Sequence, residues 1–425
     1  MQIPVESAQQ KRLVKKAFFC YNYGNGKKRR AIIVFHKKGN RMFTLFKNGS
    51  VYNTAEKCFA RSDLLVRDGV IVDPAYSGEL PADCETVDCT GRYLLPGLVD
   101  VHTHGRSGFD FNSVDNDAVV ALRKSYAKAG TTTLMATLAS APIDDLYNSI
   151  KHIGANRTPA CGMATLAGIH LEGRYLNPKR RGAHATELLY PLDAAELETM
   201  MTAMLPLPVH VSCAAEMEGG ETFVKTAIRL GATVGMAHSD ATWDEAKKAV
   251  EWGVTSFTHT FNAMKPVHHR EPGNAAASLL TDTAWSEFIC DGEHIHPAMI
   301  ALAARCKPAD KLVLITDSME AAAMPDGEYG IAGLPVFVKN GRAVNSDGAL
   351  AGSTLDLFRG LTNFMKFTGW TLEEALPCAT SNPAAMVGID ADCGSLSAGR
   401  RADIVMITDK ERPEIESVRV LGERI

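Results

Sequence analysis

The stretch PGLVDVHTHG at residues 96–105 carries two histidines, His102 and His104, at the end of a run of apolar residues. Such a run predicts a buried β-strand over residues 98–104. Alternate side chains of a strand share one face, so both imidazoles point the same way and could bind one metal ion. Taken alone, the motif leaves two interpretations open, because hydrogen bonding also explains a pair of histidines near a strand end.

Seven further runs of β-branched or apolar residues follow the first, and helical segments separate them. The runs are TTTLMATLA (131–139), TLAGIHLEG (165–173), PVHVSCAAE (208–216), TVGMAHS (233–239), SFTHTF (256–261), EFICDG (287–292) and KLVLITDS (311–318). One intervening helix, over residues 242–253, begins with the capping-box pair Thr242 and Glu245 and ends at Gly253. Eight strands that each precede a helix predict an α/β fold, a (β/α)₈ TIM barrel over residues 96–385.

Polar residues fall at the C-terminal ends of these strands, which is where barrel enzymes build their active sites. The ends carry His102, His104, Glu172, His238, His259, Asp291 with His294 nearby, and Asp317. Buried imidazoles and carboxylates are costly unless they are paired, and a metal centre accounts for them together. Nitrogen and oxygen ligands without a thiolate favour Zn²⁺ or Fe²⁺.

An ion of this kind lowers the pKa of bound water from about 15.7 toward about 7 and polarises a carbonyl group, so hydrolysis is the predicted reaction. Asp317 follows the apolar run LVLIT and is the candidate general base. The other interpretation of Asp317 is a further metal ligand, and the two roles are compatible.

Short strand and turn patterns occupy both ends of the chain outside the predicted barrel. They are MFTLFKNGSVYN (42–53), LLVRDGVIVD (64–73) with an Asp-Gly hairpin signal, ETVDCTGRYLLPG (85–97), GSLSAGRRADIVMI (394–407) and SVRVLGERI (417–425). We expect residues 42–95 and 386–425 to pair into one small β-sandwich domain.

The net charge of −4 conceals an uneven distribution. Residues 1–41 contain eleven Lys or Arg and a single acid, Glu6, so the remainder of the chain carries −14. Two interpretations of this basic extension stay open: a solvated arm, or a stretch upstream of a true start at Met42. It lacks an apolar helical face and interleaved aromatic residues, so neither nucleic-acid nor membrane binding is predicted.

The sequence contains no run of 18 or more apolar residues and no apolar core of a signal peptide, so we expect a cytoplasmic protein. Its ten cysteines are scattered and form no CxxC pair. We expect them to be reduced thiols, mostly in the core.

Several longer motifs together resemble the N-acetylglucosamine-6-phosphate deacetylases of the amidohydrolase superfamily. They are PGLVDVHTHG, HLEGRYLNPKRRGAH, AHSDATWDEA, THTFNAMKPVHHREPG, DGEHIHP, LITDSMEAAAMPDGEY, GALAGSTL, TSNPAAMVGID and GSLSAGRRADIVM. The resemblance runs from about residue 44 to the C-terminus. HLEG, THTFNAM and HHREPG are specific to these deacetylases, whereas the HxH motif alone indicates only the superfamily.

The resemblance implies a role for each matching position. Glu172, His238 and His259 become the principal metal ligands, and His102 with His104 hold a second ion in members that bind two. Asp317 becomes the catalytic aspartate, and His294 the histidine that contacts the substrate and helps to polarise the acetyl carbonyl. The implied substrate-binding positions are Ala183, His184, Asn262, Ala263, Arg270, Asp291, His294, Leu350, Ala351, Gly352 and Ser353. Arg270 is the candidate clamp for the sugar phosphate of the neighbouring subunit, which implies a homodimer.

Three positions near the predicted site depart from the family pattern: Arg174 replaces a Pro, Ser318 an Ala and Met324 a Gly. They put the substrate preference in doubt more than the reaction. The predicted reaction is deacetylation of N-acetylglucosamine 6-phosphate, and its galactosamine epimer is the first alternative. A cyclic-amide hydrolase or deaminase is disfavoured because Glu172 occupies the position of the usual bridging carboxylated lysine. A catalytically inactive scaffold is disfavoured because no candidate ligand is missing.

Overall fold

A computed structural model of the chain describes residues 42–73, 76, 78–204 and 206–425. The basic extension predicted for residues 1–41 lies outside the described residues. No helix in the described part of the chain is long and apolar enough to cross a membrane. The nine cysteines within it are free thiols, as expected.

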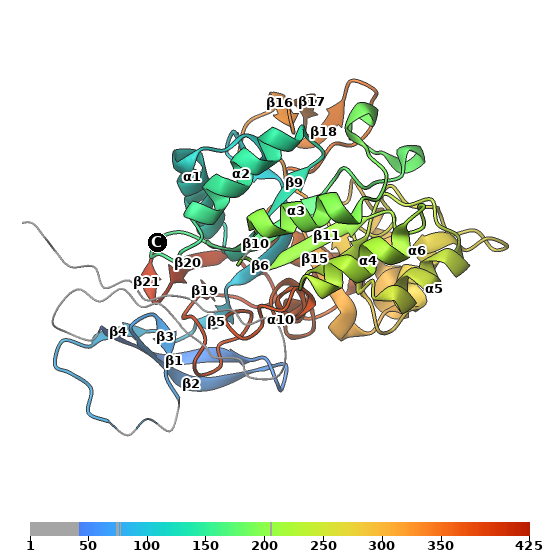
Figure 1. The fold of residues 1–425 in the computed structure, drawn as a ribbon. Coiled ribbons are helices and arrows are strands. Elements are labelled where there is room, and N and C mark those ends of the chain that lie inside the picture. Colours follow the sequence, from blue (N-terminus) through green and yellow to red (C-terminus); the bar gives the residue numbers. More distant parts are fainter. Residues whose placement is uncertain (1–41, 74–75, 77, 205) are drawn as a thin grey trace, which may run out of the picture.

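Eight parallel strands form the central barrel (Figure 1). They are β6 (Leu98–Thr103), β9 (Thr131–Ala139), β10 (Thr165–Glu172), β11 (Val209–Cys213), β12 (Thr233–Met236), β13 (Ser256–Phe257), β14 (Trp285–Ile289) and β15 (Leu312–Ile315). Each strand pairs with the next one along the chain, so the order in the sheet is the order in the sequence. The prediction of a (β/α)₈ barrel is confirmed, and all eight expected runs contain a strand.

The barrel closes just beyond the last residue of β15. The amide of Asp317 donates to the carbonyl of His102 (2.9 Å), and the amide of His104 donates to the carbonyl of Ser318 (2.8 Å). Thr103 and Ser318 form a parallel bridge between these two segments. The seam between the first and last strands therefore holds three of the predicted site residues.

A helix follows each barrel strand and covers its outer face. The helices are α1 (Asn116–Lys128), α2 (Ile143–Ala155), α3 (Ala194–Met204), α4 (Gly220–Arg229), α5 (Trp243–Trp252), α6 (Gly273–Leu280), α7 (Pro297–Cys306) and α8 (Leu357–Thr368). The start predicted for α5 is confirmed, because the side chains of Thr242 and Glu245 each accept from the other residue's backbone amide. Gly253 ends this helix in the left-handed region (φ 119°), where glycine avoids the clash of a side chain.

Strands from both ends of the chain pair into one eight-stranded sheet. The predicted pairing of the two ends is confirmed, and the β-sandwich form of this domain stays a prediction. It contains β1 (Phe43–Asn53), β2 (Cys58–Arg67), β3 (Val70–Ile71), β4 (Glu85–Asp88), β5 (Tyr93–Pro96), β19 (Ile404–Ile407), β20 (Ile415–Val420) and β21 (Glu423–Arg424). The predicted hairpin joins β2 to β3 through Asp68 and Gly69, both at positive φ. The guanidinium carbon of Arg419 on β20 lies 4.9 Å from the ring centre of Phe46 on β1, so the sheet curls over a shared core. The exact division between residues 42–95 with 386–425 and residues 96–385 stays a prediction.

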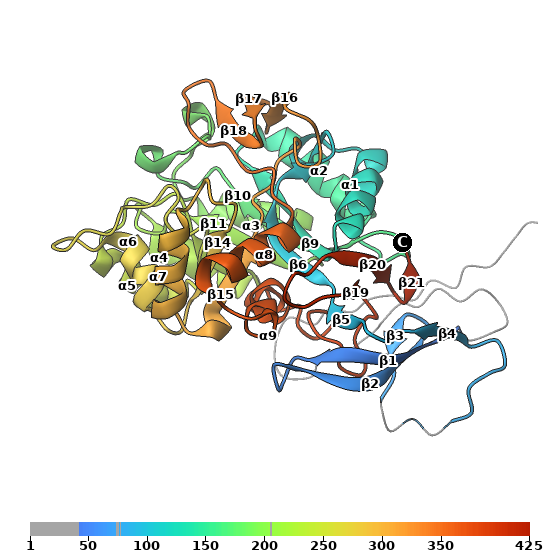
Figure 2. The ribbon, with the colours of Figure 1, turned by 180° about the vertical axis from the view of Figure 1, so that it is seen from behind.

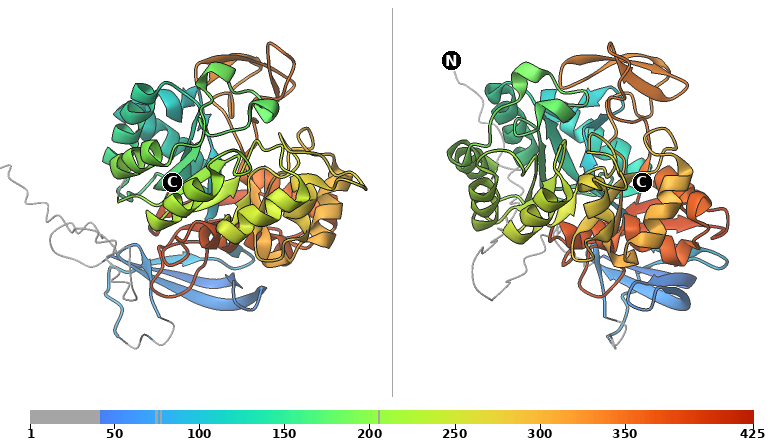
Figure 3. Two further views of the ribbon diagram at one scale, coloured as in Figure 1. Left: turned by 45° about the vertical axis from the view of Figure 1, so that its right-hand side comes forward. Right: turned by 90° about the vertical axis from the view of Figure 1, so that its right-hand side faces the viewer.

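A small insertion separates β15 from α8 and was not foreseen from the sequence. It is the antiparallel sheet of β16 (Gly327–Ile331), β17 (Leu334–Lys339) and β18 (Arg342–Asn345). Both views of Figure 3 place this insertion at one end of the barrel and strands β1 and β2 at the other. The mouth of the barrel therefore lies between the insertion and the strand ends.

The remaining elements are short. They are β7 (Gly105–Arg106), β8 (Phe109–Asp110), α9 (Leu372–Ala375), α10 (Ser381–Met386) and the 3₁₀ turns Phe111–Ser113, Pro178–Arg180, Thr186–Leu188, Ala309–Lys311 and Leu376–Ala379. Figure 2 shows α8 and α9 on the side of the barrel that faces away in Figure 1.

A buried hydroxyl group braces the seam of the barrel. The phenol of Tyr126 on α1 lies 2.5 Å from Thr103 Oγ1 and 3.3 Å from Ser318 Oγ, and it donates to the carbonyl of Gly105 (2.8 Å). Tyr126→Phe removes these bonds and leaves buried partners unpaired, so we expect the free energy of unfolding to fall by about 1–3 kcal/mol in chemical denaturation.

The matched control is Tyr329→Phe, because the Tyr329 hydroxyl donates to Pro325 O on the exposed insertion (2.7 Å). This variant should change the unfolding free energy by less than about 0.5 kcal/mol. Equal effects of the two substitutions would show that Tyr126 does not brace the seam.

Candidate metal centre

Three of the predicted site residues adopt a left-handed backbone conformation directly after their strands. His238, His259 and Asp317 have φ of 45°, 34° and 50°, and each lies two residues beyond the last residue of β12, β13 or β15. Such a conformation costs of order 1–3 kcal/mol for a residue with a side chain, and it persists where the surroundings hold it. Here the bend turns each side chain from the strand toward the barrel mouth.

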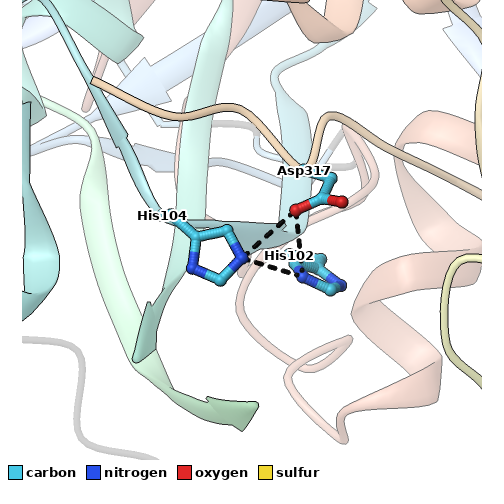
Figure 4. A group of neighbouring side chains, drawn as sticks. All are labelled: His102, His104 and Asp317. Atoms are coloured by element: carbon cyan, nitrogen blue, oxygen red, sulfur yellow. Dashed lines mark hydrogen bonds and ion pairs between the residues drawn. The ribbon is translucent and has the colours of Figure 1, made fainter. Parts of the chain in front are cut away.

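His102, His104 and Asp317 form the first cluster of ligand atoms (Figure 4). The Nε2 atoms of the two histidines are 3.4 Å apart, and Asp317 Oδ1 lies 3.4 Å from the former and 3.1 Å from the latter. All three side chains point toward one another in the figure. The i and i+2 spacing of His102 and His104, at the end of β6, has the predicted effect: both imidazoles face the barrel interior.

Glu172, the last residue of β10, joins this cluster to a second one. Its Oε2 lies 3.3 Å from His102 Nε2 and 3.0 Å from His104 Nε2. Its Oε1 lies 3.3 Å from His238 Nε2 and 2.9 Å from His259 Nε2, and these two nitrogens are 3.2 Å apart. Each oxygen of the Glu172 carboxylate therefore contacts a different pair of imidazoles.

These separations fit bound cations. A tetrahedral ion with bonds of about 2.0–2.1 Å separates its ligand atoms by about 3.3 Å, which is close to the distances in both clusters. In each cluster, two Nε2 atoms and one oxygen of Glu172 lie within 3.4 Å of one another, as the ligand atoms of a single ion do. His184 also offers a nitrogen to the second cluster, within 4.8 Å of ligand atoms of Glu172 and His238, but His259 lies closer to Glu172.

The charges of the clusters favour a cation. Burial by itself raises the pKa of Asp317, but attraction to His102 and the hydrogen bond with His104 outweigh it and lower the pKa to about 2. Burial opposes the charged form of His104, and the hydrogen bonds with Asp317 and Glu172 overcome it and raise the pKa to about 9. Burial likewise opposes the charged form of Glu172, but attraction to His102 and hydrogen bonds with the imidazoles hold its pKa well below the usual range. Asp317 and Glu172 thus remain ionised and attract positive charge into the space between them.

A loop fixes the orientation of the His238 ring. His238 Nδ1 lies 2.7 Å from the carbonyl oxygen of Arg180, which can only accept, so Nδ1 carries the proton and Nε2 presents a lone pair to the cluster. Gly182 also packs against this ring, because a Cβ added there would come within 2.9 Å of His238 Cε1 and 3.4 Å of Nδ1. The loop that carries the predicted substrate-binding residues Ala183 and His184 therefore also positions a ligand.

A cavity of about 440 Å³ opens above the clusters at the barrel mouth. Seven predicted substrate-binding residues line it: Ala183, His184, Asn262, Ala263, His294, Leu350 and Gly352. Lys179, Arg180 and Arg181 also line it and were missed by the sequence analysis, although three consecutive cations were a visible signal. The insertion contributes Ile331 and Leu334 as an apolar wall.

Four predicted residues lie outside the lining of this cavity. Ala351 is buried, and Ser353 uses its amide to donate to the carbonyl of Asp317 (2.7 Å), which supports the strained backbone there. Asp291 accepts from His294 Nδ1 (2.6 Å), so it orients the histidine that lines the cavity. Arg270 is exposed, and its guanidinium contacts His269 in the same loop.

Burial opposes the charged form of His294, but the hydrogen bond and charge of Asp291 raise its pKa. The pair therefore keeps a proton on Nδ1 at the cavity wall. The raised pKa also favours a second proton on Nε2, and this N–H can face an oxygen on which negative charge develops.

Arg174, which replaces a proline of the family pattern, is a structural clamp. Its guanidinium is buried, pairs with both carboxylate oxygens of Glu196 on α3 (2.9 and 3.1 Å) and lies over the ring of Tyr190. Its backbone adopts φ of 63°, which proline cannot. The substitution therefore changes how the loop at residues 174–190 is held against the barrel.

Residues 93–425 match the model of the Amidohydrolase family. The chain is 34% identical over 344 residues to the N-acetylgalactosamine-6-phosphate deacetylase of Escherichia coli O157:H7, covering 81% of this chain and 90% of that one. It is 34% identical over 334 residues to the N-acetylglucosamine-6-phosphate deacetylase of Vibrio furnissii, covering 79% and 83%. A solved structure of a variant N-acetyl-D-glucosamine-6-phosphate deacetylase from Mycobacterium smegmatis, in complex with N-acetyl-D-glucosamine-6-phosphate, superposes with a TM-score of 0.80 at 28% identity and covers 91% of this chain and 99% of that one.

Gly182→Ala tests whether the loop positions His238. The added Cβ collides with the imidazole, so we expect the second cluster to bind Zn²⁺ at least about 10-fold more weakly in calorimetric titration. Gly162→Ala is the matched control, since Gly162 also has positive φ (77°) but no atom lies within 4 Å of its Cβ position. Equal Zn²⁺ affinities in the two variants would contradict the positioning role.

Proposed function

Because this chain belongs to the amidohydrolase family, we propose that it hydrolyses the acetamide group of N-acetyl-D-glucosamine 6-phosphate, giving acetate and D-glucosamine 6-phosphate. The observation that carries this proposal is the pair of ligand clusters joined by Glu172 beneath a cavity of sugar size. The similarity to named deacetylases over about four fifths of the chain supports the substrate class.

The metal ligands in this proposal are Glu172, His238 and His259 for one ion and His102 with His104 for a second. The ligand chemistry favours Zn²⁺ or Fe²⁺. A divalent ion supplies Lewis acidity at this position, which lowers the pKa of water and polarises a carbonyl oxygen. The four imidazoles and Glu172, all buried, would hold the ions at the floor of the cavity.

Asp317 is the proposed general base and acid. Its low pKa keeps it ionised and able to accept a proton at Oδ1 or Oδ2. Its side chain lines the cavity, and Oδ1 lies 3.4 and 3.1 Å from the Nε2 atoms of His102 and His104. The same carboxyl can then return that proton to the amine nitrogen of the leaving sugar. His294, oriented by Asp291, supplies a hydrogen-bond donor to the acetyl oxygen.

The sugar phosphate is bound toward the rim of the cavity. We assign the binding of the sugar to the predicted residues that line the cavity, which are Ala183, His184, Asn262, Ala263, Leu350 and Gly352. Ala351 and Ser353 lie outside this lining and would act only by holding the neighbouring backbone. Arg270 lies on an exposed loop, which suits a role in the active site of a neighbouring subunit and implies a homodimer. The cytoplasmic location expected from the sequence stays a prediction.

N-Acetylgalactosamine 6-phosphate is the second candidate substrate, and one observation favours it. The relative from Escherichia coli O157:H7 that is named for this substrate matches as well as the glucosamine-specific relatives, with 34% identity. The two sugars differ at one hydroxyl, so a few contacts in the cavity decide between them.

Asp317→Asn tests the general base. The amide keeps the shape of the side chain but cannot accept the proton, so we expect kcat for acetate release to fall by about 10²–10⁴-fold while the metal content stays unchanged. Asp282→Asn, an exposed aspartate before β14, is the control and should retain wild-type turnover. Near-normal turnover of Asp317→Asn would refute its role.

An acetate-release assay on three sugars tests the substrate. With Zn²⁺- or Fe²⁺-reconstituted enzyme, kcat/KM should be highest for N-acetylglucosamine 6-phosphate, lower for the galactosamine epimer, and at least about 100-fold lower for unphosphorylated N-acetylglucosamine, which lacks the charge that Arg270 would bind. Equal rates without the phosphate would contradict the Arg270 clamp. No acetate from any of the three sugars would refute the proposed function.

A further inference from the structure

Glu287 is a carboxylate buried in the barrel beneath the first ligand cluster. It lies on β14, and its side chain is 0% exposed. Among the described residues, no Lys or Arg side chain forms an ion pair with it. Because an isolated buried carboxylate costs several kcal/mol, its charge requires a positive neighbour.

The nearest side chain that could supply a positive charge is His102, whose Nδ1 atom faces Glu287. Glu287 Oε2 lies 3.5 Å from His102 Nδ1, a separation within the range of an ion pair, and this nitrogen has no hydrogen-bond partner among the described residues. The opposite nitrogen of the same ring, Nε2, faces Glu172, Asp317 and His104. His102 therefore lies in line between the buried carboxylate and the first cluster.

The other cluster histidines lack such a partner. His238 Nδ1 faces a carbonyl oxygen, and the Nδ1 atoms of His104 and His259 are buried without a hydrogen bond. Glu287 contacts the second cluster only at the backbone of His259, whose amide donates weakly to Oε2 at 3.4 Å. The imidazole that the carboxylate faces thus belongs to the cluster formed by His102, His104 and Asp317.

The second oxygen of Glu287, Oε1, is buried without a hydrogen-bond partner among the described residues. Oε1 lies 3.8 Å from His210 Nε2, and the absence of a side chain at Gly235 leaves room there, because a Cβ would come within 2.9 Å of His210 Nε2 and of Ser256 Oγ. Burial lowers the pKa of His210 to about 4, so this imidazole is neutral and supplies no compensating charge. The positive charge that compensates the Glu287 carboxylate therefore has to come from His102 and the cluster to which it belongs.

We propose that Glu287 is the positioning residue for His102 and thereby controls how tightly the cluster of His102, His104 and Asp317 binds its ion. The proposal rests on the metal-dependent function above. A carboxylate that faces Nδ1 at ion-pair distance favours the tautomer with its proton on Nδ1, raises the basicity of Nε2 and places a negative charge beneath the cluster. The ion at the other cluster, which lacks this support, depends on Glu287 much less.

Two substitutions separate the charge of Glu287 from its volume. Glu287→Gln keeps an acceptor oxygen and removes the charge, whereas Glu287→Met removes both at nearly constant size. In calorimetric titration of the chelator-treated full chain with Zn²⁺ alone, wild type should bind two ions. The weaker of the two affinities should fall by roughly 10- to 100-fold in Glu287→Gln and further in Glu287→Met, with the other affinity nearly unchanged.

Reference variants identify which ion is lost. His104→Gln lacks a ligand of the first cluster and His238→Gln lacks a ligand of the second, so each should keep the affinity of the other cluster. The affinity that stays unchanged in Glu287→Met should equal the one that remains in His104→Gln and differ from the one that remains in His238→Gln. Glu216→Gln is the matched control, since Glu216 binds Asn177, Ser239 and the Asp240 amide and does not contact His102. It should still bind two ions. Should Glu287→Met fail to fold by circular dichroism, the titration of Glu287→Gln decides.

Two unchanged affinities in the folded Glu287 variants would overturn the proposal, as would a wild-type protein that binds one ion at saturation. Loss of both ions to the same extent would also overturn it, because Glu287 would then act on the whole barrel. The titration needs no substrate, so a failed acetate assay with normal ion binding would count against the proposed reaction and leave this inference standing.

Discussion

The carboxylate of Glu172 is the interaction on which the candidate site depends. Its two oxygens face different pairs of imidazoles, at 2.9–3.3 Å, and the four histidines come from three strands. Without it, the two clusters would be separate groups of buried histidines with little reason to converge. The barrel supplies this convergence because all eight strands run in parallel and end at one mouth.

Much of this arrangement could be predicted from the sequence, because it follows from local patterns. The alternation in LVDVHTH places His102 and His104 on one face, and apolar runs that end in HLE, AHS and THT place Glu172, His238 and His259 at strand ends. Even β13, which has only the two residues Ser256–Phe257, was located by the polar residues that follow it. The pairing of the two chain ends in one sheet followed from their shared strand and turn patterns.

The rest depends on contacts between distant segments, which no local pattern contains. The left-handed conformations of His238, His259 and Asp317 are set by hydrogen bonds from elsewhere, such as the amide of Ser353 on the carbonyl of Asp317. The clamp of Arg174 on Glu196 and the insertion β16–β18 likewise arise from tertiary packing. For the same reason Ser353 and Asp291, which resemblance assigned to substrate binding, support other site residues in the structure.

The seam of the barrel has a consequence for the order in which the molecule assembles. His102 and His104 come from the first barrel strand and Asp317 from the last, so more than 200 residues must be synthesised and folded before their side chains can meet. Contacts of such long sequence separation form late and slow folding. An ion held across the seam would therefore join the first and last strands and oppose the opening of the barrel. The resistance of the protein to unfolding would then depend on the concentration of available metal.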